Sequence, residues 1–253
     1  MKRLTRETGR TSANAMRLRT ALLLLVTLSA CSTSRPFVTT IGALPPGTTM
    51  HIRAVSAQID VYKPKIGEPS NRYTISATAF SGQKQPPPPM LLPTRDGISV
   101  AANDPLRFLL VRAPAAVNVD VRSQRGNVSV TDISGNATAY AGNGDVHIML
   151  SGYAQASTGN GNITVYMGAG HWPGTLHFST DHGDVLIYVK ATAHFTAQLH
   201  TDDGTIFTDF RLHGSARGTA ETLAGAVAGG GKQAIDIHVK RGAIRLLRLL
   251  PQS

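Results

Sequence analysis

The chain of 253 residues has a single cysteine and few charged (16%) or aromatic (6%) side chains. One cysteine cannot form a disulfide within the chain, so the fold must be stable without one. The scarcity of charged residues argues against exposed helices, whose surfaces are rich in Glu and Lys. The chain has 25 glycines and many Val, Ile, Leu and Ala residues, a composition that favours an all-β fold with many tight turns.

The sequence also lacks an apolar run long enough to span a bilayer, which takes about 20 residues. Its most apolar stretch, residues 21–28, is preceded by basic side chains and followed by Ser29, Ala30 and Cys31. This order is typical of a secretory signal peptide. Residues 28–31 (Leu-Ser-Ala-Cys) resemble the lipobox of bacterial lipoproteins, whose pattern is Leu-(Ala/Ser)-(Gly/Ala)-Cys.

The lipobox resemblance implies how the N-terminus is processed. Residues 1–30 are a signal peptide that is cleaved after Ala30, and the thiol of Cys31 carries diacylglycerol. Each buried methylene contributes about 0.8 kcal/mol, so two or more acyl chains anchor a protein stably. Ser32, where inner-membrane lipoproteins have Asp, implies the outer membrane. Residues 31–47 then form a lipidated tether.

Two alternatives remain open at this end of the chain. Cys31 can instead be a buried residue that follows an apolar helix by chance, although the polar residues 32–36 do not continue such a core. Met16 is an alternative start, because the segment that follows it is a compact signal by itself. If Cys31 is acylated, the domain has no thiol left for a disulfide or for nucleophilic catalysis.

The net charge of +10 overstates the basicity of the domain. Residues 1–30 hold six of the 25 basic residues and one of the 15 acidic ones, which leaves about +5 for the rest. No basic patch is interleaved with aromatic residues, so we do not expect nucleic acid binding. The expected partners are the membrane, through the lipid, and an envelope protein or polysaccharide.

A glycine-centred repeat dominates residues 125–246, with copies such as NGDVHI (143–148) and NGNITV (160–165). Two and four residues after the glycine stand apolar residues, most of them β-branched, with a mostly polar residue between them. The repeat glycines are Gly126, Gly144, Gly161, Gly183, Gly204 and Gly242. They are separated by 18, 17, 22, 21 and 38 residues, and the last gap is about two units of 19.

This spacing predicts a single-stranded β-helix, or solenoid, with turns of about 17–22 residues. Glycine turns the chain at no steric cost, and like side chains stack inward on strands about 4.8 Å apart. The solenoid is predicted over residues 48–250, with a Pro-rich loop at 82–93 that can also be a recognition peptide. A β-sandwich of hairpins is the alternative, although its strands recur every 8–12 residues.

Residues 50–249 resemble a widespread bacterial adhesin-like domain family of unknown function. The resemblance is carried by the glycine turns and by the closing segment GAVAGGGKQAIDIHVKRGAIRLL (225–247). It implies a β-helix built of Ser/Asn-Gly-Asp-(Val/Ile)-x-(Val/Ile) turns. These motifs specify architecture rather than activity.

Two metal hypotheses arise from the turns and the histidines. The segments around Asp145 and Asn162 resemble Ca²⁺-binding nonapeptides, but later copies replace the acid, so we expect these side chains to cap turns. Five of the nine histidines lie within residues 171–200, and alternation predicts that His147, His177, His194 and His200 face outward. Their spacing matches no known zinc pattern, so solvated histidines are expected rather than a Zn²⁺ or Cu²⁺ site.

Catalysis and partner binding are the remaining hypotheses. One hypothesis is that five aspartates gather on one side, as in β-helical polysaccharide enzymes, although most of them lie in or next to the turns: Asp181, Asp184, Asp202, Asp203 and Asp209. Leu186, Tyr188 and Phe207 are predicted to face outward and, with Trp172, to form a patch for a protein or a sugar. Cover by the N-terminal section or by residues 210–231 is the alternative.

Taken together, the sequence predicts a lipid-anchored outer-membrane protein whose solenoid is a non-enzymatic binding, adhesion or scaffold module. No catalytic residue, cofactor or metal ligand is assigned. The alternatives are a β-helical enzyme acting on envelope polysaccharide and an accessory protein of envelope-stress signalling.

Overall fold

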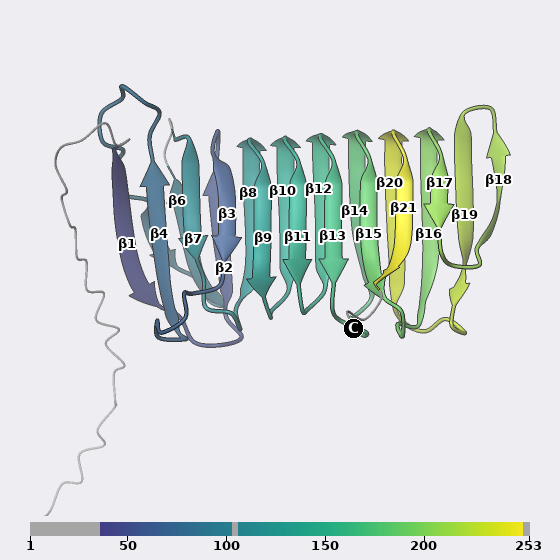
Figure 1. Cartoon of the computed structure of the whole chain (residues 1–253), viewed down its shortest axis with the longest axis horizontal. Helices are drawn as coiled ribbons and strands as arrows, with labels where there is room; N and C mark the ends of the chain where they lie inside the picture. The colour runs from purple at the N-terminus through teal and green to yellow at the C-terminus, as the bar shows by residue number, and fades with distance from the viewer. Residues whose placement is uncertain (1–35, 103–105, 250–253) are drawn as a thin grey trace, which may run out of the picture.

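A computed structural model describes residues 36–102 and 106–249, which form strands, turns and bends (Figure 1). The predicted signal peptide of residues 1–30 and the predicted lipid attachment residue Cys31 lie outside these residues. Within the described ranges, no helix is long and apolar enough to cross a membrane.

The strands form two sheets that face each other. Sheet A has ten strands, in the order β1 (Phe37–Ala43), β4 (Arg72–Thr78), β7 (Phe108–Arg112), β3 (Gln58–Tyr62), β9 (Val128–Ile133), β11 (Val146–Leu150), β13 (Ile163–Met167), β15 (Val185–Lys190), β21 (Ile244–Leu249) and β17 (Ile206–Thr208). Sheet B has eleven, in the order β18 (His213–Arg217), β19 (Ala220–Val227), β16 (Phe195–Asp203), β20 (Ala234–Arg241), β14 (Thr175–His182), β12 (Ala154–Asn160), β10 (Ala137–Asn143), β8 (Asn118–Arg125), β2 (Thr49–Ala54), β6 (Gly97–Ala102) and β5 (Met90–Pro93).

Each coil of the chain contributes one strand to each sheet, and the strands of neighbouring coils pair in parallel. The middle of the molecule consists of four coils that follow one another in sequence: β8–β9, β10–β11, β12–β13 and β14–β15. Val128 pairs with Val146, Val146 with Ile163, and Ile163 with Val185. Like residues therefore lie above one another, which confirms the predicted solenoid and excludes a sandwich of hairpins.

The core lies between the two sheets and is made by every second side chain of each strand. In β11, Val146 and Ile148 are buried, whereas His147 and Met149 point away from the core. The positions two and four residues after the repeat glycines are buried in the same way, except for Thr208, which is half-buried. Small residues such as Ala139 and Ala156 fill the facing positions of sheet B, which lets the sheets pack closely.

The coils do not stack in sequence order at the C-terminal end. The last coil, β20–β21, lies between β14–β15 and β16–β17, and it is the yellow pair inside the green strands of Figure 1. The 38-residue gap before Gly242 holds no second coil, because β18 and β19 form an antiparallel hairpin that extends sheet B from β16. In sheet A, the six-residue strand β21 pairs on both sides, with β15 and β17, whereas the three-residue strand β17 lies at the edge.

The N-terminal end has the same kind of reordering. The coil β2–β3 lies next to β8–β9, and β6–β7, which comes later in the chain, lies outside it. Antiparallel strands β1 and β4 continue sheet A beyond β7. Within the segment that was predicted to be a Pro-rich loop (82–93), residues 90–93 form the edge strand β5, a position that tolerates proline because one edge needs no partner.

Candidate functional site

The repeat glycines form one column along the turn that links each sheet B strand to the next strand of sheet A. Gly126, Gly144, Gly161, Gly183 and Gly242 all have a positive φ, between 134° and 154°. A Cβ atom on Gly144 would meet the carbonyl group of Gly126, the preceding glycine in the column. The later glycines of the column have the same relation to the glycine before them. Gly204, in the outermost coil, lies against the carbonyl of Gly242 but has no left-handed φ.

The polar residues that follow these glycines bind the backbone of the next coil. The Asp145 side chain accepts a hydrogen bond from the backbone N–H of Asn162 at 2.7 Å. The Asn162 side chain in turn accepts one from the backbone N–H of Asp184 at 2.8 Å. Asp184 accepts one from the Ala243 amide and a second from Arg245. These side chains cap turns, because their oxygens accept hydrogen bonds from the neighbouring coil.

The five aspartates of the enzyme hypothesis are divided among sheet B, the turn after β14 and the end of β17 in sheet A. Asp181 and Asp202 lie on sheet B, where Asp181 pairs with Lys240 at 2.7 Å. Asp209 follows β17 in sheet A and accepts a hydrogen bond from the Arg248 amide. Lys240 holds the pKa of Asp181 below its usual value through a hydrogen bond. The acids are therefore dispersed along the turns and strands.

Another group of charged side chains gathers on sheet B near the N-terminal end. Asp120 accepts hydrogen bonds from Arg53 and Arg122 at 3.3 Å and lies 3.2 Å from a ring nitrogen of His51. The second ring nitrogen of His51 lies 3.1 Å from Asp96, and this contact lowers the pKa of Asp96. The two carboxylates, Asp96 and Asp120, are thus paired with basic side chains. These contacts link β2 to β8 and to the turn before β6.

Trp172 does not take part in the predicted outward patch, and this part of the prediction is wrong. Its side chain is buried against Phe195, and its indole N–H donates to the carbonyl of Ala234. An aromatic ring of this size finds apolar cover and a hydrogen-bond partner where the inserted strand β20 begins. Residues 213–227 do not cover the patch either, since they form β18 and β19 in sheet B.

The outer face of sheet A carries a band of apolar and aromatic side chains over β11, β13, β15, β21 and β17. Four of them are register partners across neighbouring strands: Met149, Tyr166, Tyr188 and Leu247. The neighbouring row holds His147, Thr164, Leu186, Arg245 and Phe207. Met149 is 40% exposed and Phe207 is 55% exposed. We call these nine residues the sheet A face.

Two tyrosines lie at the centre of the sheet A face. The rings of Tyr166 and Tyr188 are stacked with centroids 4.5 Å apart and an angle of 6° between their planes. His147 meets the Tyr166 ring edge-on at 6.1 Å, and the Arg245 guanidinium lies 5.9 Å from the Phe207 ring. Partial burial and the neighbouring Tyr188 raise the pKa of Tyr166. Tyr166 therefore stays neutral at ordinary pH, and the face combines apolar surface with one cation, Arg245.

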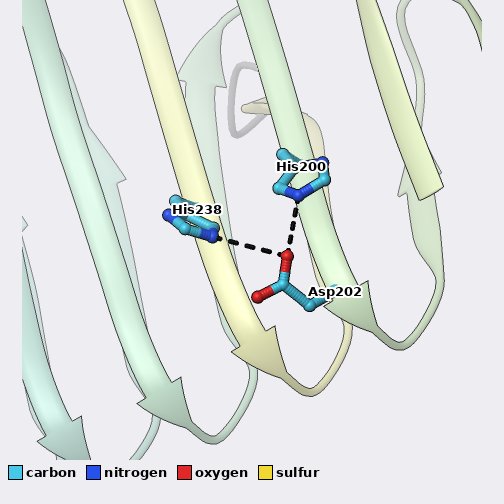
Figure 2. A group of neighbouring side chains, drawn as sticks. All are labelled: His200, Asp202 and His238. Carbon is cyan, nitrogen blue, oxygen red and sulfur yellow. Dashed lines mark hydrogen bonds and ion pairs between the residues drawn. The ribbon is translucent and has the colours of Figure 1, made fainter. Parts of the chain in front are cut away.

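The outer face of sheet B is polar where β14, β20 and β16 lie side by side. His200 of β16 and His238 of β20 are register partners, and their rings lie 5.3 Å apart. Asp202 Oδ1 lies 2.8 Å from His200 Nε2 and 3.8 Å from His238 Nε2 (Figure 2). Within residues 36–102 and 106–249, this is the one group of three or more His, Cys, Asp or Glu side chains whose ligand atoms lie within 4.8 Å of one another.

Some of these residues could be predicted from the sequence and others could not. Tyr188, Leu186 and Phe207 were predicted to face outward, but Met149 and Tyr166 were not singled out, although they occupy the same outward positions of their copies. Of the histidines that were predicted to face outward, His147 lies on sheet A and His177 and His200 lie on sheet B. His238 was missed because nothing in the sequence indicates that β20 lies next to β16.

Comparison with known proteins gives a family but no activity. A family model described as Toastrack DUF4097 matches residues 94–247, which include the four middle coils and the inserted one. One solved structure that aligns with the chain is described as "a putative cell adhesion protein" from Clostridium sporogenes, with 10% identity and a TM-score of 0.44. The alignment covers 83% of this chain and 99% of that one. No curated protein sequence matches the chain.

Proposed function

The chain belongs to the Toastrack family DUF4097, a family of unknown function, and we propose that it is a non-enzymatic binding or scaffold module of the bacterial cell envelope. The observation that carries the proposal is the sheet A face, where Met149, Tyr166, Tyr188 and Phe207 lie outward on neighbouring strands. The corresponding surface of sheet B carries polar residues such as His177, Ser179 and Asp236.

The composition of the sheet A face supports a protein as the partner. Tyr, Phe, Met and Arg are enriched in the centres of protein interfaces, whereas Lys, Glu and Asp are depleted there. Sugar-binding tyrosines offer a free ring face for stacking. Tyr166 and Tyr188 cover each other's inner faces, because their planes are almost parallel at 4.5 Å. A flat protein surface therefore fits this band better than a sugar ring.

The placement of the acids supports a role without catalysis. A polysaccharide enzyme needs two carboxylates that flank one bond, about 5–10 Å apart, in a groove that holds the sugar. Asp181, Asp184 and Asp209 instead bind Lys240, Arg245 and the Arg248 amide, respectively. These pairings hold strands and turns together.

We propose further that the lipid on Cys31 anchors the module to the outer membrane and that residues 31–47 are its tether. Cys31→Ala removes the thiol that accepts the lipid. The expected result is an unprocessed chain with the mass of the unacylated precursor, which leaves the membrane fraction. Mass spectrometry and fractionation measure this, and a Cys31→Ala chain with the normal mass and normal membrane fractionation would refute the anchor.

The sheet A face is tested by a double substitution, Tyr166→Ser with Tyr188→Ser, in a Cys31→Ser background that removes the lipid. We expect binding to isolated envelopes, measured by sedimentation, to fall more than about tenfold, because truncating central interface aromatics costs about 2 kcal/mol or more. Tyr140→Ser is the matched control, since Tyr140 is 42% exposed on the opposite sheet.

Treating the envelopes beforehand separates the classes of partner. If the partner is a protein, protease treatment abolishes the binding and lysozyme treatment leaves it intact. Loss of binding after lysozyme alone assigns the face to polysaccharide. A double variant that melts and sediments like the wild type contradicts the proposed role of the face.

A further inference from the structure

Three potential metal ligands converge on the outer face of sheet B, away from the sheet A face. His200 and His238 are directly opposite each other on the paired strands β16 and β20. Asp202 lies two residues after His200, so alternation places both on the same side of the sheet. Figure 2 shows the two imidazole rings turned toward one carboxylate oxygen, at 2.8 and 3.8 Å.

The donor set and its spacing fit a borderline-soft divalent cation. Zinc binds imidazole nitrogen and carboxylate oxygen at about 2.0–2.2 Å, so the ligand atoms of a tetrahedral site lie about 3.3 Å apart. The three ligand atoms already lie within 4.8 Å of one another, and all three side chains are at least 39% exposed. Small rotations about the side-chain bonds bring the atoms to that spacing and leave the fourth position open to solvent.

We propose that His200, Asp202 and His238 form a divalent transition-metal site of the zinc type, which links the inserted strand β20 to β16. Two imidazoles and one carboxylate are three of the four ligands of a tetrahedral zinc ion, and water or a ligand from outside the chain supplies the fourth. The site crosses the boundary between coils that lie about 40 residues apart in sequence. It is independent of the sheet A face.

A neighbouring side chain orients the first histidine for this role. Nδ1 of His200 lies 2.7 Å from the Thr222 hydroxyl on β19. A hydroxyl can donate or accept, so it can accept the Nδ1 proton when Nε2 uses its lone pair to bind a metal. Metal-bound histidines in proteins almost always donate their second N–H to such a partner.

The positive charge of Lys240 does not prevent a metal ion from binding at this position. Lys240 lies two residues after His238 on the same face of β20, but its ammonium group binds Asp181 of β14 at 2.7 Å. The charge of the lysine is thereby balanced by Asp181. Another histidine of this face, His177, has its own carboxylate partner, Asp236, at 3.3 Å.

Zinc titration of the full chain tests the site, with the chain made in a Cys31→Ser background and without a polyhistidine tag. After dialysis against a chelator, calorimetry with zinc alone is expected to give one ion per chain. His238→Gln and Asp202→Asn are each expected to weaken binding more than tenfold, and Thr222→Val by about 10–100-fold. His177→Gln is the matched control and is expected to leave the affinity unchanged.

Thermal unfolding provides a second readout. Zinc binds only the folded arrangement of β16 and β20, so it raises the melting temperature of the wild type and not that of His238→Gln. Without zinc the two melt together, because His238 is exposed. The proposal is overturned if the wild type binds no zinc, or if His177→Gln and His238→Gln weaken binding equally, which would indicate scattered surface histidines.

Discussion

At the scale of single residues, the space beside each turn glycine is occupied by a backbone carbonyl of the neighbouring coil. A Cβ on Gly161 would lie closer than 3.0 Å to the carbonyl of Gly144, and its φ of 154° is one that other residues rarely adopt. The glycine is therefore required both by its dihedral angle and by the close approach of two coils. The same two requirements explain why the glycine recurs in the sequence once per coil.

Gly161→Ala is expected to lower the free energy of unfolding by about 3 kcal/mol or more, since backbone strain adds to displacement of the Gly144 carbonyl. Gly174→Ala is the matched control, because Gly174 has a φ of 64° and nothing within 4 Å of its Cβ position. It is expected to cost about 1–2 kcal/mol. Urea unfolding of both variants measures the difference, and equal losses would contradict the close approach of the coils.

At the scale of strands, stability comes from apolar columns that run through the stack. Val146 is 1% exposed and lies between Val128 and Ile163 in the same column. Each member covers the next, and no side chain of the column faces water except at its ends. Since the described chain has no helix, this stacking and the ladder hydrogen bonds between coils are what hold it together.

Val146→Asp places a carboxylate in this column and is expected to destabilise the fold by about 3–5 kcal/mol. His147→Asp introduces the same group on the adjacent outward position and is expected to change stability by less than about 0.5 kcal/mol. Thermal and urea unfolding compare the two variants. A Val146→Asp protein that melts like the wild type would show that the inward register is wrong.

The sequence predicts this element-level architecture well because the same pattern recurs in every copy. Gly126 and the residues that follow it specify a turn and an inward register from local information alone. The order of the coils cannot be predicted in this way. The turn at Gly242 resembles the turn at Gly204 in sequence, so the repeat does not specify which of the two coils lies next to β14–β15. Pairing of β20 with β14 joins residues far apart in sequence, such as Thr175 and Ala234, and no single copy indicates such a contact.

The residues of the candidate sites also differ in whether local sequence or long-range pairing determines their positions. Tyr188 and Phe207 were placed outward by alternation alone, because each belongs to a recognisable copy. His238 comes next to His200 only through the insertion of β20, a contact between residues 38 positions apart in sequence. Trp172 was misplaced because it lies in a connection between copies, where the repeat gives no register.

At the scale of the whole molecule, the solenoid presents two outer faces of different chemistry. Sheet A exposes the band around Tyr166 and Tyr188, whereas sheet B exposes histidines, serines and acids over β12, β14 and β20. Both ends are finished by antiparallel strands, β1 and β4 at one end and β18 and β19 at the other, which limit further parallel pairing (Figure 1). On our proposal, a lipid on Cys31 keeps this two-faced module near the membrane.

Photo-crosslinking in intact cells tests most directly that the sheet A face is the binding surface. A photoreactive residue is placed at Thr164, which faces outward between His147 and Leu186, or at Ser157, which faces outward on sheet B. The account predicts a discrete crosslinked adduct from position 164 and none from position 157. Equal adducts from both positions, or none from position 164, would contradict it.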